Sequence, residues 1–557
     1  MPRFLRYRCI YRYGRSKFLF LSNSIKGRLT FMTKQISRRA FLGVMGGSAA
    51  AVTLAGCSGG SSSSSSSSST GAKTYKDTLK IAITANPPSL DPHYVNSNVV
   101  SGISMHIYEP LFALNEKYEV TPVLAESYTK EGTDYIIKIR QGVKFHNGQE
   151  LTADDVVASM TRWVNTSGKA KPLLGGSTFE KVDDYTVKLT PVQDSSDVML
   201  VLAGQFQFAA IYPESVASSN SGDKAITEHI GTGPYKMKEW KQDQYVQLEK
   251  YEDYVSPTGP VSGFTGAKTP STEILEFDVV TDAQTRLNGL RSGEYDVAED
   301  LLAEDYSSIK DESGIDVQTK PSGSLNLFLN CSPSGKLSNV KLRQAILAAL
   351  NCDDIMLSAY GDKDLYQMSC SWMNPTDTSW AVEDGKEYYN QNDASKAKQL
   401  AEEAGYNGET LTFVATQDYP EMYSGTLAIQ DQLTKAGFNV DVVNYDFSTF
   451  MQKRADAASF DLFVTQNVYN ISPVQLNLIN KSWNQFEDPK VDELTTEIRD
   501  VNTTDPKKPW GELQEYLYEQ GSATVLGHNQ RVMATSDKLE DFTFFTFPVY
   551  WNCKIAS

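Results

Sequence analysis

Hydrophobic positions in the second half of the chain alternate between strand-like and helix-like spacing. Runs typical of buried strands occupy 325–330, 411–416, 440–445 and 460–465. Apolar residues at helical spacing occupy 340–350, 394–404, 422–436 and 447–457, and Asn339 and Asp393 stand where N-caps would lie. This order predicts a sheet covered by helices.

The first half shows the same two periods at longer intervals. Strands are predicted at 79–84, 135–139, 186–190 and 273–280, and helices at 99–114, 153–163 and 282–292. Thr152 precedes Asp155 by three residues, as in a capping box. Gly142, Gly148, Gly231 and Gly233 are expected at turns that need unusual backbone angles.

A different pattern fills residues 37–57, SRRAFLGVMGGSAAAVTLAGC. Arg38 and Arg39 followed by an uncharged stretch resemble a twin-arginine export signal, and the ending at Cys57 resembles a lipoprotein cleavage box. Cys57 is therefore predicted to carry the lipid anchor. Gly and Ser dilute the apolar stretch too much to favour the alternative, a transmembrane helix.

Two further segments flank this signal. Residues 58–73 contain nine consecutive serines and are predicted to be a hydrophilic linker. Residues 1–31 are basic and rich in tyrosine, and an export signal that starts at Met32 does not need them. We expect translation to begin at Met32. Within residues 1–57, residues 1–31 would then not be translated, and the export signal would occupy the rest.

Charge and cysteine content narrow the function. The net charge is −17, and residues 1–57 hold 11 basic and no acidic residues, so the remainder carries 41 basic against 69 acidic side chains, or −28. Such a surface argues against nucleic-acid partners. No CxxC pair occurs among Cys331, Cys352, Cys370 and Cys553, for which buried free thiols are favoured over a disulfide.

Catalytic and metal-binding signatures are not found in the sequence. It contains no GxSxG, HExxH, P-loop or GxGxxG motif, and its five histidines are scattered. His146, beside Asn147-Gly148, is interpreted as a structural hydrogen-bonding residue. No cofactor, metal or catalytic residue is predicted, and a secreted hydrolase remains a distant alternative.

Eight short motifs in a fixed order resemble the solute-binding proteins of peptide-type ABC importers, the family of oligopeptide- and dipeptide-binding proteins. They are LDP (90–92), YEPL (108–111), LAES (124–127), GVKFHNG with TADDV (142–156), GTGPY (231–235), SGEYD (292–296), VKLRQA (340–345) and EAGY (403–406). The resemblance implies that this chain is a bilobal α/β protein of the type II periplasmic-binding fold. The chain would cross between the lobes twice, forming a hinge, and would contain an inserted subdomain.

The resemblance implies a division of the mature chain. Lobe I is expected to be discontinuous, the subdomain to be inserted into it, and lobe II to be nearly continuous. The expected ranges are 74–119, 200–322 and 530–557 for lobe I, 120–199 for the subdomain and 323–529 for lobe II.

The solute is less well defined than the fold. Peptide-binding members hold the ligand's ammonium with an aspartate just before a tyrosine, but here Tyr469 follows Asn467 and Val468, and no acid lies between Asp461 and Glu487. Either the amine is met elsewhere, for instance by Asp446 or Glu421, or the solute has no free amine. The candidate ligand-binding residues are Asn86, Trp372, Tyr419, Gln466, Asn467, Tyr469 and Asn470, with Trp380 as a further aromatic.

The resemblance implies an extracytoplasmic, lipid-anchored, monomeric receptor on the bacterial cell membrane. It would capture an oligopeptide or peptide-like solute between its lobes and deliver it to an ABC permease and ATPase complex. Two alternatives keep the fold: a non-peptide solute such as an oligosaccharide, haem or a nickel complex, or a role as a peptide-signal receptor.

Overall fold

A computed structural model describes residues 73–219, 222–479 and 481–557. The predicted export signal at Arg38 and Arg39 and the predicted lipidation site at Cys57 lie outside these residues.

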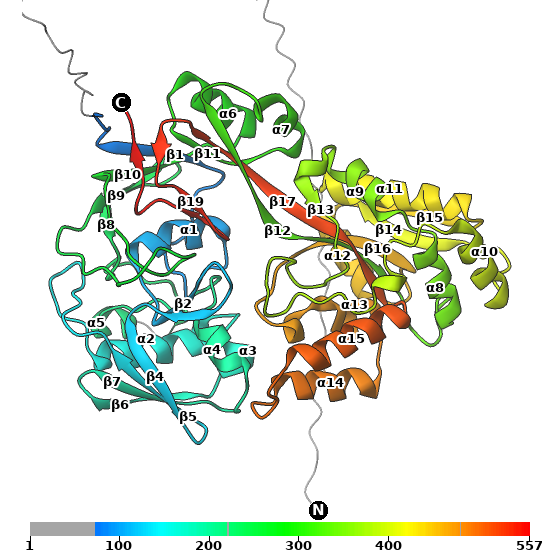
Figure 1. The fold of residues 1–557 in the computed structure, drawn as a ribbon, viewed down its shortest axis with the longest axis horizontal. Helices are drawn as coiled ribbons and strands as arrows, with labels where there is room; N and C mark the ends of the chain where they lie inside the picture. The colour runs from blue at the N-terminus through cyan, green and yellow to red at the C-terminus, as the bar shows by residue number, and fades with distance from the viewer. Residues whose placement is uncertain (1–72, 220–221, 480) are drawn as a thin grey trace, which may run out of the picture. The chain divides into compact units, whose positions relative to one another are not determined.

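One eleven-stranded mixed sheet runs through the described chain (Figure 1). Its strands, in spatial order, are β15 (Val440–Tyr445), β14 (Leu411–Thr416), β16 (Leu462–Val468), β12 (Ile315–Leu329), β17 (Ala523–Ser536), β11 (Val297–Leu301), β1 (Thr78–Ile83), β10 (Ile274–Val279), β9 (Tyr245–Lys250) and β8 (Tyr235–Lys241), with β13 (Tyr366–Gln367) beside β17. Parallel and antiparallel pairs both occur, as expected of a mixed α/β protein.

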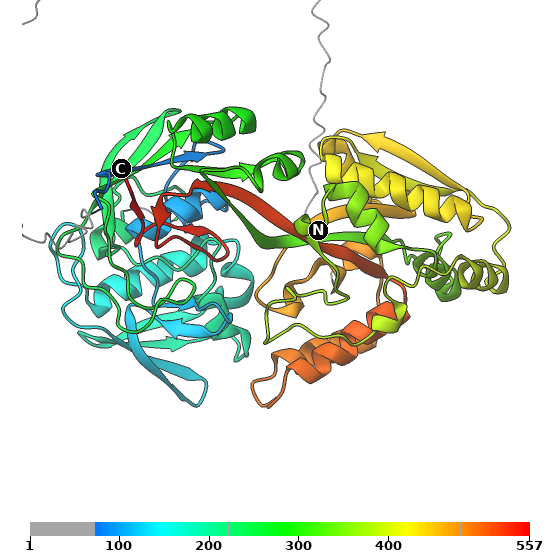
Figure 2. The ribbon, with the colours of Figure 1, turned by 45° about the horizontal axis from the view of Figure 1, so that its top comes forward.

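Strands β12 and β17 connect the two halves of this sheet. They are 15 and 14 residues long and pair antiparallel, from Ile315 with Ser536 at one end to Phe328 with Ala523 at the other. In Figures 1 and 2 both strands run from one lobe into the other. The chain therefore crosses between two lobes twice, which confirms the bilobal fold expected from the sequence.

Helices cover the sheet in the second lobe. They are α8 (Val340–Ala348), α9 (Cys352–Tyr360), α10 (Ala394–Glu403), α11 (Pro420–Lys435), α12 (Phe447–Ala455), α13 (Lys481–Asn484), α14 (Pro489–Arg499) and α15 (Lys507–Glu519). Asn339 and Asp393 cap α8 and α10 as predicted, because each side chain accepts a hydrogen bond from a backbone N–H of the first turn.

The first lobe packs around two further hydrophobic cores, one of which lies within residues 111–211. That core includes residues of the four-stranded sheet β4 (Ala125–Glu131), β5 (Asp134–Ile139), β7 (Thr186–Thr190) and β6 (Thr178–Asp183), and of helix α2 (Ala153–Thr166). The remaining elements of this lobe are α1 (Asn98–Ile107), β2 (Phe112–Leu114), β3 (Val120–Pro122), α3 (Lys171–Leu174), α4 (Asp197–Leu202), α5 (Glu214–Ala217), α6 (Ala283–Ser292), α7 (Ala303–Ile309), β18 (Leu539–Glu540), β19 (Thr543–Phe544), β20 (Pro548–Val549) and β21 (Lys554–Ile555).

Four predicted element boundaries were wrong by three residues or more. The helix predicted over 153–163 continues to Thr166. The helix expected over 99–114 ends at Ile107, because the following Pro110 cannot continue it. The strand expected at 325–330 begins ten residues earlier, where Pro321 and Gly323 at a register shift obscure the pattern. The strand expected at 460–465 extends to Val468, so Gln466 and Asn467 lie on β16 rather than in a loop.

The glycines of the GTGPY motif are required for a reason different from the predicted one. Gly142 and Gly148 have φ of +74° and +84°, as expected, but Gly231 and Gly233 do not have positive φ. A Cβ on Gly231 would instead lie 2.0 Å from the Ile107 carbonyl oxygen. His146 holds this contact from the other side, since its Nδ1 accepts from Gly231 N at 3.2 Å and its Nε2 lies 2.9 Å from Gly233 O. His146 is thus a structural hydrogen-bonding residue, as interpreted.

We therefore expect Gly231→Ala to lower the free energy of unfolding by about 1–3 kcal/mol, because the added methyl group meets backbone atoms that cannot move aside. Gly102→Ala is the matched control: it lies in α1, and nothing lies within 4 Å of its Cβ. That change should be neutral or stabilising by up to about 1 kcal/mol. Urea unfolding of both variants measures the difference, and equal stabilities would contradict the close-approach explanation.

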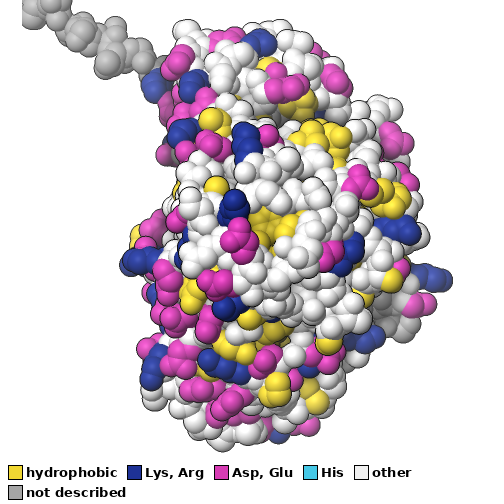
Figure 3. All heavy atoms as spheres, turned by 90° about the vertical axis from the view of Figure 1, so that its right-hand side faces the viewer, with side chains coloured by type: hydrophobic (Ala, Val, Ile, Leu, Met, Phe, Trp, Pro, Cys, Tyr) yellow, Lys and Arg dark blue, Asp and Glu magenta, His cyan; other side chains and the backbone are white. Residues whose placement is uncertain are grey.

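Several whole-molecule features bear on function. Cys331, Cys352, Cys370 and Cys553 are all buried and free, in agreement with the favoured prediction. Acidic and basic side chains intermingle over the face shown in Figure 3. In the part of the chain that the structure describes, no group of three or more His, Cys, Asp or Glu side chains is placed to hold a metal ion. No helix among these residues has the length and apolar character needed to span a bilayer.

Candidate functional site

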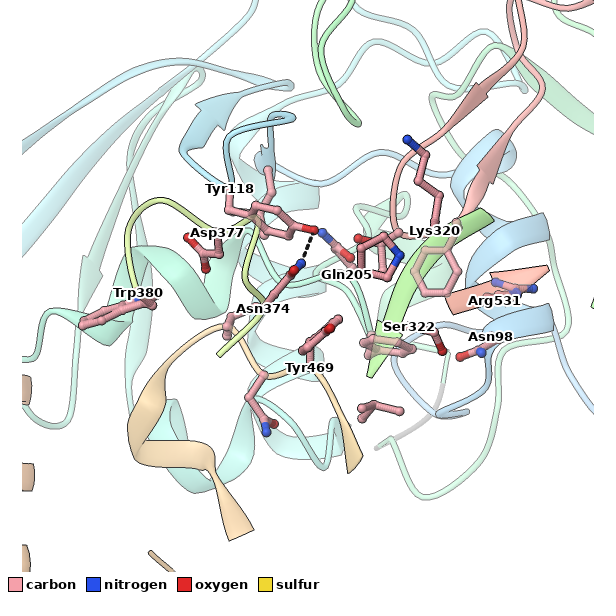
Figure 4. Close-up of a pocket in the computed structure, with 18 of the residues that line it drawn as sticks. Asn98, Tyr118, Gln205, Lys320, Ser322, Asn374, Asp377, Trp380, Tyr469 and Arg531 are labelled. Atoms are coloured by element: carbon pink, nitrogen blue, oxygen red, sulfur yellow. Dashed lines mark hydrogen bonds between the residues drawn. The ribbon is translucent and has the colours of Figure 1, made fainter. Parts of the chain in front are cut away.

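A pocket lies where the two lobes face each other, beside the crossing strands (Figure 4). Its cavity volume is about 90 Å³, which is room for a small guest or several waters, since one water needs roughly 10–15 Å³. Both lobes contribute lining residues: Asn98, Leu114, Tyr118, Leu200, Gln205, Phe206, Phe544, Thr546 and Phe547 from the first, Asn374, Asp377, Trp380, Val468, Tyr469, Asn470 and Ile471 from the second, and Lys320, Pro321, Ser322 and Arg531 from the crossing strands.

One hydrogen bond joins the lobes across this pocket. Asn374 Nδ2 donates to Tyr118 Oη at 2.7 Å (Figure 4). Tyr118 sits at φ +64° in the turn between β2 and β3, and its ring packs on Phe545. Asn374 is buried in the loop between β13 and α10 and also accepts from Thr376. The pocket is therefore closed by groups that separate when the lobes separate.

The Arg531 guanidinium is already neutralised. It pairs with Asp300, and its Nη2 also lies 3.4 Å from Glu299 Oε2. Burial alone would lower the pKa of Arg531, but the charges of Asp300 and Glu299 raise it overall. Asp300 has φ +48° at an irregularity of β11, which turns this carboxylate toward the arginine.

The two other charged residues of the pocket lining, Asp377 and Lys320, differ in whether the protein supplies a partner for their side chains. Asp377 Oδ1 accepts a hydrogen bond from Ser379 N at 2.9 Å within its own turn, and burial raises the pKa of Asp377 to about 6. Lys320 makes no ion pair with any described residue. The pocket thus offers one uncompensated positive charge, amide groups and aromatic rings, a lining suited to small polar organic solutes.

The structure brings two of the candidate residues into this pocket. Tyr469 and Asn470 line it, as does Trp380. The Tyr469 hydroxyl lies 2.9 Å from His528 Nδ1, and the two rings stack.

The other candidates lie outside the pocket lining. Gln466 donates to Tyr360 Oη at 2.8 Å, and Asn467 accepts from Asn477 at 3.0 Å. Trp372 is 3% exposed and packs within the second-lobe core, whereas Tyr419 is 40% exposed and precedes α11. Asn86 accepts from the backbone N–H of Asp243.

The structure also shows what the two acids proposed for the amine do. Asp446 caps α12 by accepting from Thr449 N at 3.0 Å, and it does not line the pocket. Glu421 lies in the first turn of α11, also outside the lining. Neither carboxylate is placed to meet a charge in this cavity.

Several polar lining residues were not predicted from the sequence, namely Tyr118, Gln205, Lys320 and Asn374. Tyr118 and Asn374 are 256 positions apart, so no local pattern could pair them. The one local signal is Lys320-Pro321-Ser322-Gly323, which interrupts a strand-like run and marks the register shift in β12 at the pocket wall.

Comparison with known proteins identifies the family. The sequence model of "Bacterial extracellular solute-binding proteins, family 5 Middle" matches residues 119–487. The chain belongs to this family. The family that the sequence motifs suggested, that of peptide-type solute-binding proteins of ABC importers, is therefore confirmed.

Relatives of this family 5 protein carry names consistent with that assignment. A probable peptide ABC transporter periplasmic-binding protein of Sinorhizobium fredii is 25% identical over 511 residues, covering 86% of this chain and 93% of its own. The glutathione-binding protein GsiB of Escherichia coli strain K12 is 26% identical over 373 residues, covering 66% and 69%.

Solved structures share the fold. The substrate-binding protein CtaP of Listeria monocytogenes matches with a TM-score of 0.73 at 21% identity, covering 87% of this chain and all of its own. The oligopeptide-binding protein AppA of Bacillus subtilis, solved with a nonapeptide, matches with a TM-score of 0.65 at 23% identity, again covering 87% and 100%. The family 5 chain therefore has the bilobal type II periplasmic-binding fold.

Proposed function

We propose that this protein captures an oligopeptide or peptide-like solute in the interlobe pocket and delivers it to an ABC permease and ATPase complex, without chemistry of its own. The main support for this proposal is the interlobe pocket, because its walls come from both lobes and the Tyr118–Asn374 hydrogen bond spans it. A guest that contacts both walls would favour the closed arrangement, which is a shape a permease can recognise.

The place of action and the division of the chain belong to the same proposal. The motif that ends at Cys57 supports a lipid anchor on the outer face of the cell membrane, with a single copy acting as receptor. Three hydrophobic cores support a lobe I and a lobe II joined at β12 and β17, with the subdomain 120–199 inserted into lobe I.

A non-peptide solute is the second candidate. The lining contains aromatic rings and the amides of Asn98, Gln205 and Asn470. Its one carboxylate among the described residues, Asp377, accepts a hydrogen bond within its own turn. Such a surface also suits neutral ligands rich in hydroxyl or amide groups.

Tyr469→Ala should weaken solute binding roughly tenfold or more, because truncating a buried aromatic anchor commonly costs 2 kcal/mol or more. The matched control is Tyr419→Ala, which removes an equal side chain that is exposed outside the lining.

Native mass spectrometry of the purified protein identifies the co-purifying solute. Thermal melts with that solute then report binding, since a ligand of the folded state raises the melting temperature by mass action. Equal melting shifts in wild type and the Tyr469 variant would remove this pocket from the function. If a broad panel of peptides and other nutrients raised no melting temperature, the proposed function would fail.

A further inference from the structure

A second cavity adjoins the interlobe pocket. It has a volume of about 40 Å³ and shares five lining residues with the main pocket, namely Gln205, Phe206, Tyr469, Asn470 and Ile471. Beyond them it reaches Trp163, Lys169, Val201, Gly204 and Gln475. These five residues therefore separate two adjoining cavities and belong to the lining of both.

Lys169 is the only charged residue in the lining of this second cavity. It lies between α2 and α3, where its backbone N–H donates to Ser167 Oγ at 3.2 Å. Its side chain is partly buried, and none of the described carboxylates forms an ion pair with it. The indole N–H of Trp163 is already used, since it donates to Gln207 O at 2.7 Å.

An ammonium group in this position needs a counter-charge. Burial without a partner disfavours the charged form, and the pKa of Lys169 is accordingly lowered by burial. The other polar groups of the lining are uncharged: the amides of Gln205, Asn470 and Gln475, the Tyr469 hydroxyl and the Trp163 indole. A carboxylate brought in by a guest would restore the charge balance and form a charge-assisted hydrogen bond.

We infer that the second cavity is a subsite that holds a carboxylate of the bound solute against Lys169. The inference rests on the proposed function and narrows it: the solute is a short peptide-like molecule recognised through its acidic end. The main pocket agrees with this chemistry. Lys320 there makes no ion pair with any residue that the structure describes, whereas Arg531 and Asp377 have partners within the protein.

The test uses two versions of one random tripeptide library, with free carboxyl ends and with amidated ends. The full chain is mixed with each version, bound members are identified by native mass spectrometry, and the best binder is titrated calorimetrically as acid and as amide. We expect wild type to bind the acid at least about tenfold more tightly than the amide, because hydrogen bonds to charged groups are the strong ones.

Substitutions of Lys169 test whether this residue causes the preference for the acid over the amide. Lys169→Met should abolish the difference between acid and amide, and Lys169→Arg should retain most of it. Lys171→Met is the control, because Lys171 is an exposed lysine two positions away that lines neither cavity. Thermal melts confirm that each variant is folded.

The outcomes separate the two proposals. If wild type binds acid and amide equally, or if Lys169→Met keeps the preference, the subsite is overturned while the proposed function stands. If neither library binds to wild type, peptide capture itself is overturned, and the subsite with it.

Discussion

Asp91→Asn is expected to lower the free energy of unfolding by about 3–5 kcal/mol, because it leaves a buried arginine without a counter-charge. Arg162 Nη2 lies 2.7 Å from Asp91 Oδ2, and the two side chains are 3% and 0% exposed. Asp91 also accepts hydrogen bonds from Tyr212 Oη and Ile226 N, both at 3.0 Å. Burial alone would raise the pKa of Asp91, but the Arg162 guanidinium, through its charge and its hydrogen bond, and the backbone N–H of Ile226 lower it overall.

The matched control for this change is Asp154→Asn. Asp154 pairs with Lys181 at 2.8 Å, but its side chain is half exposed, so its loss should cost less than about 1 kcal/mol. Urea unfolding followed by tryptophan fluorescence measures both variants. A loss below 1 kcal/mol for Asp91→Asn would show that the buried ion pair is not needed for stability.

This ion pair also explains why the sequence motifs indicate the fold better than the ligand. Asp91 belongs to LDP and Glu109 to YEPL. Glu109 is fully buried and pairs with Lys268 at 2.6 Å, with Tyr254 and Thr232 as further donors. Both acids hold loops of the first lobe together. Because these motif residues serve the scaffold of this chain, recognising them predicts the architecture and leaves the solute open.

Local elements were predicted well where one physical cause decides them. The strand at 440–445 follows from its apolar run, and α6 ends at Gly293 because a residue with φ +77° is needed there. The pocket was predicted poorly because its walls are brought together only by tertiary structure. Tyr118 comes from a hairpin turn of the first lobe, Lys320 from a crossing strand and Asn374 from a loop of the second.

The aromatic candidates show the same limit. Trp372 and Trp380 stand in one polar loop and are equivalent by sequence, yet Trp372 packs against Tyr518 in the core while Trp380 reaches the pocket. Tyr469 is placed by the end of β16, and the extension of that strand to Val468 directs Gln466 toward Tyr360. A difference of three residues in the predicted strand end therefore decides which of these side chains line the pocket.

The largest pH effect should come from histidines that must stay neutral in the folded protein. His93, His106 and His528 are fully buried, and burial lowers their pKa values to about 3, about 4 and about 4. The hydrogen bonds of His106 also require a neutral imidazole ring. Its Nδ1 lies 2.9 Å from Gly102 O, and its Nε2 accepts a hydrogen bond from Tyr550 N at 3.0 Å. A second proton would remove that acceptor.

Since these pKa values are lower in the folded than in the unfolded state, the unfolded chain binds more protons between pH 6.5 and 4. The contribution of these histidines to the free energy of unfolding is therefore fully present above pH 6.5. It is lost progressively as the pH falls from 6.5 to 4. From pH 7 to pH 5 each of the three histidines should cost about 2 kcal/mol. Asp278 and Asp377, whose pKa values burial raises to about 6, act in the opposite sense and offset part of the loss.

His106→Gln separates this cause from the carboxylates. A glutamine amide can donate and accept without titrating, so the variant should lose about 2 kcal/mol less than wild type between pH 7 and pH 5, whatever its stability at pH 7. Urea unfolding at both pH values gives the two differences. If wild type and variant lost the same free energy, protonation of His106 would not contribute, and the acid sensitivity of this solute-binding protein would have to come from other groups.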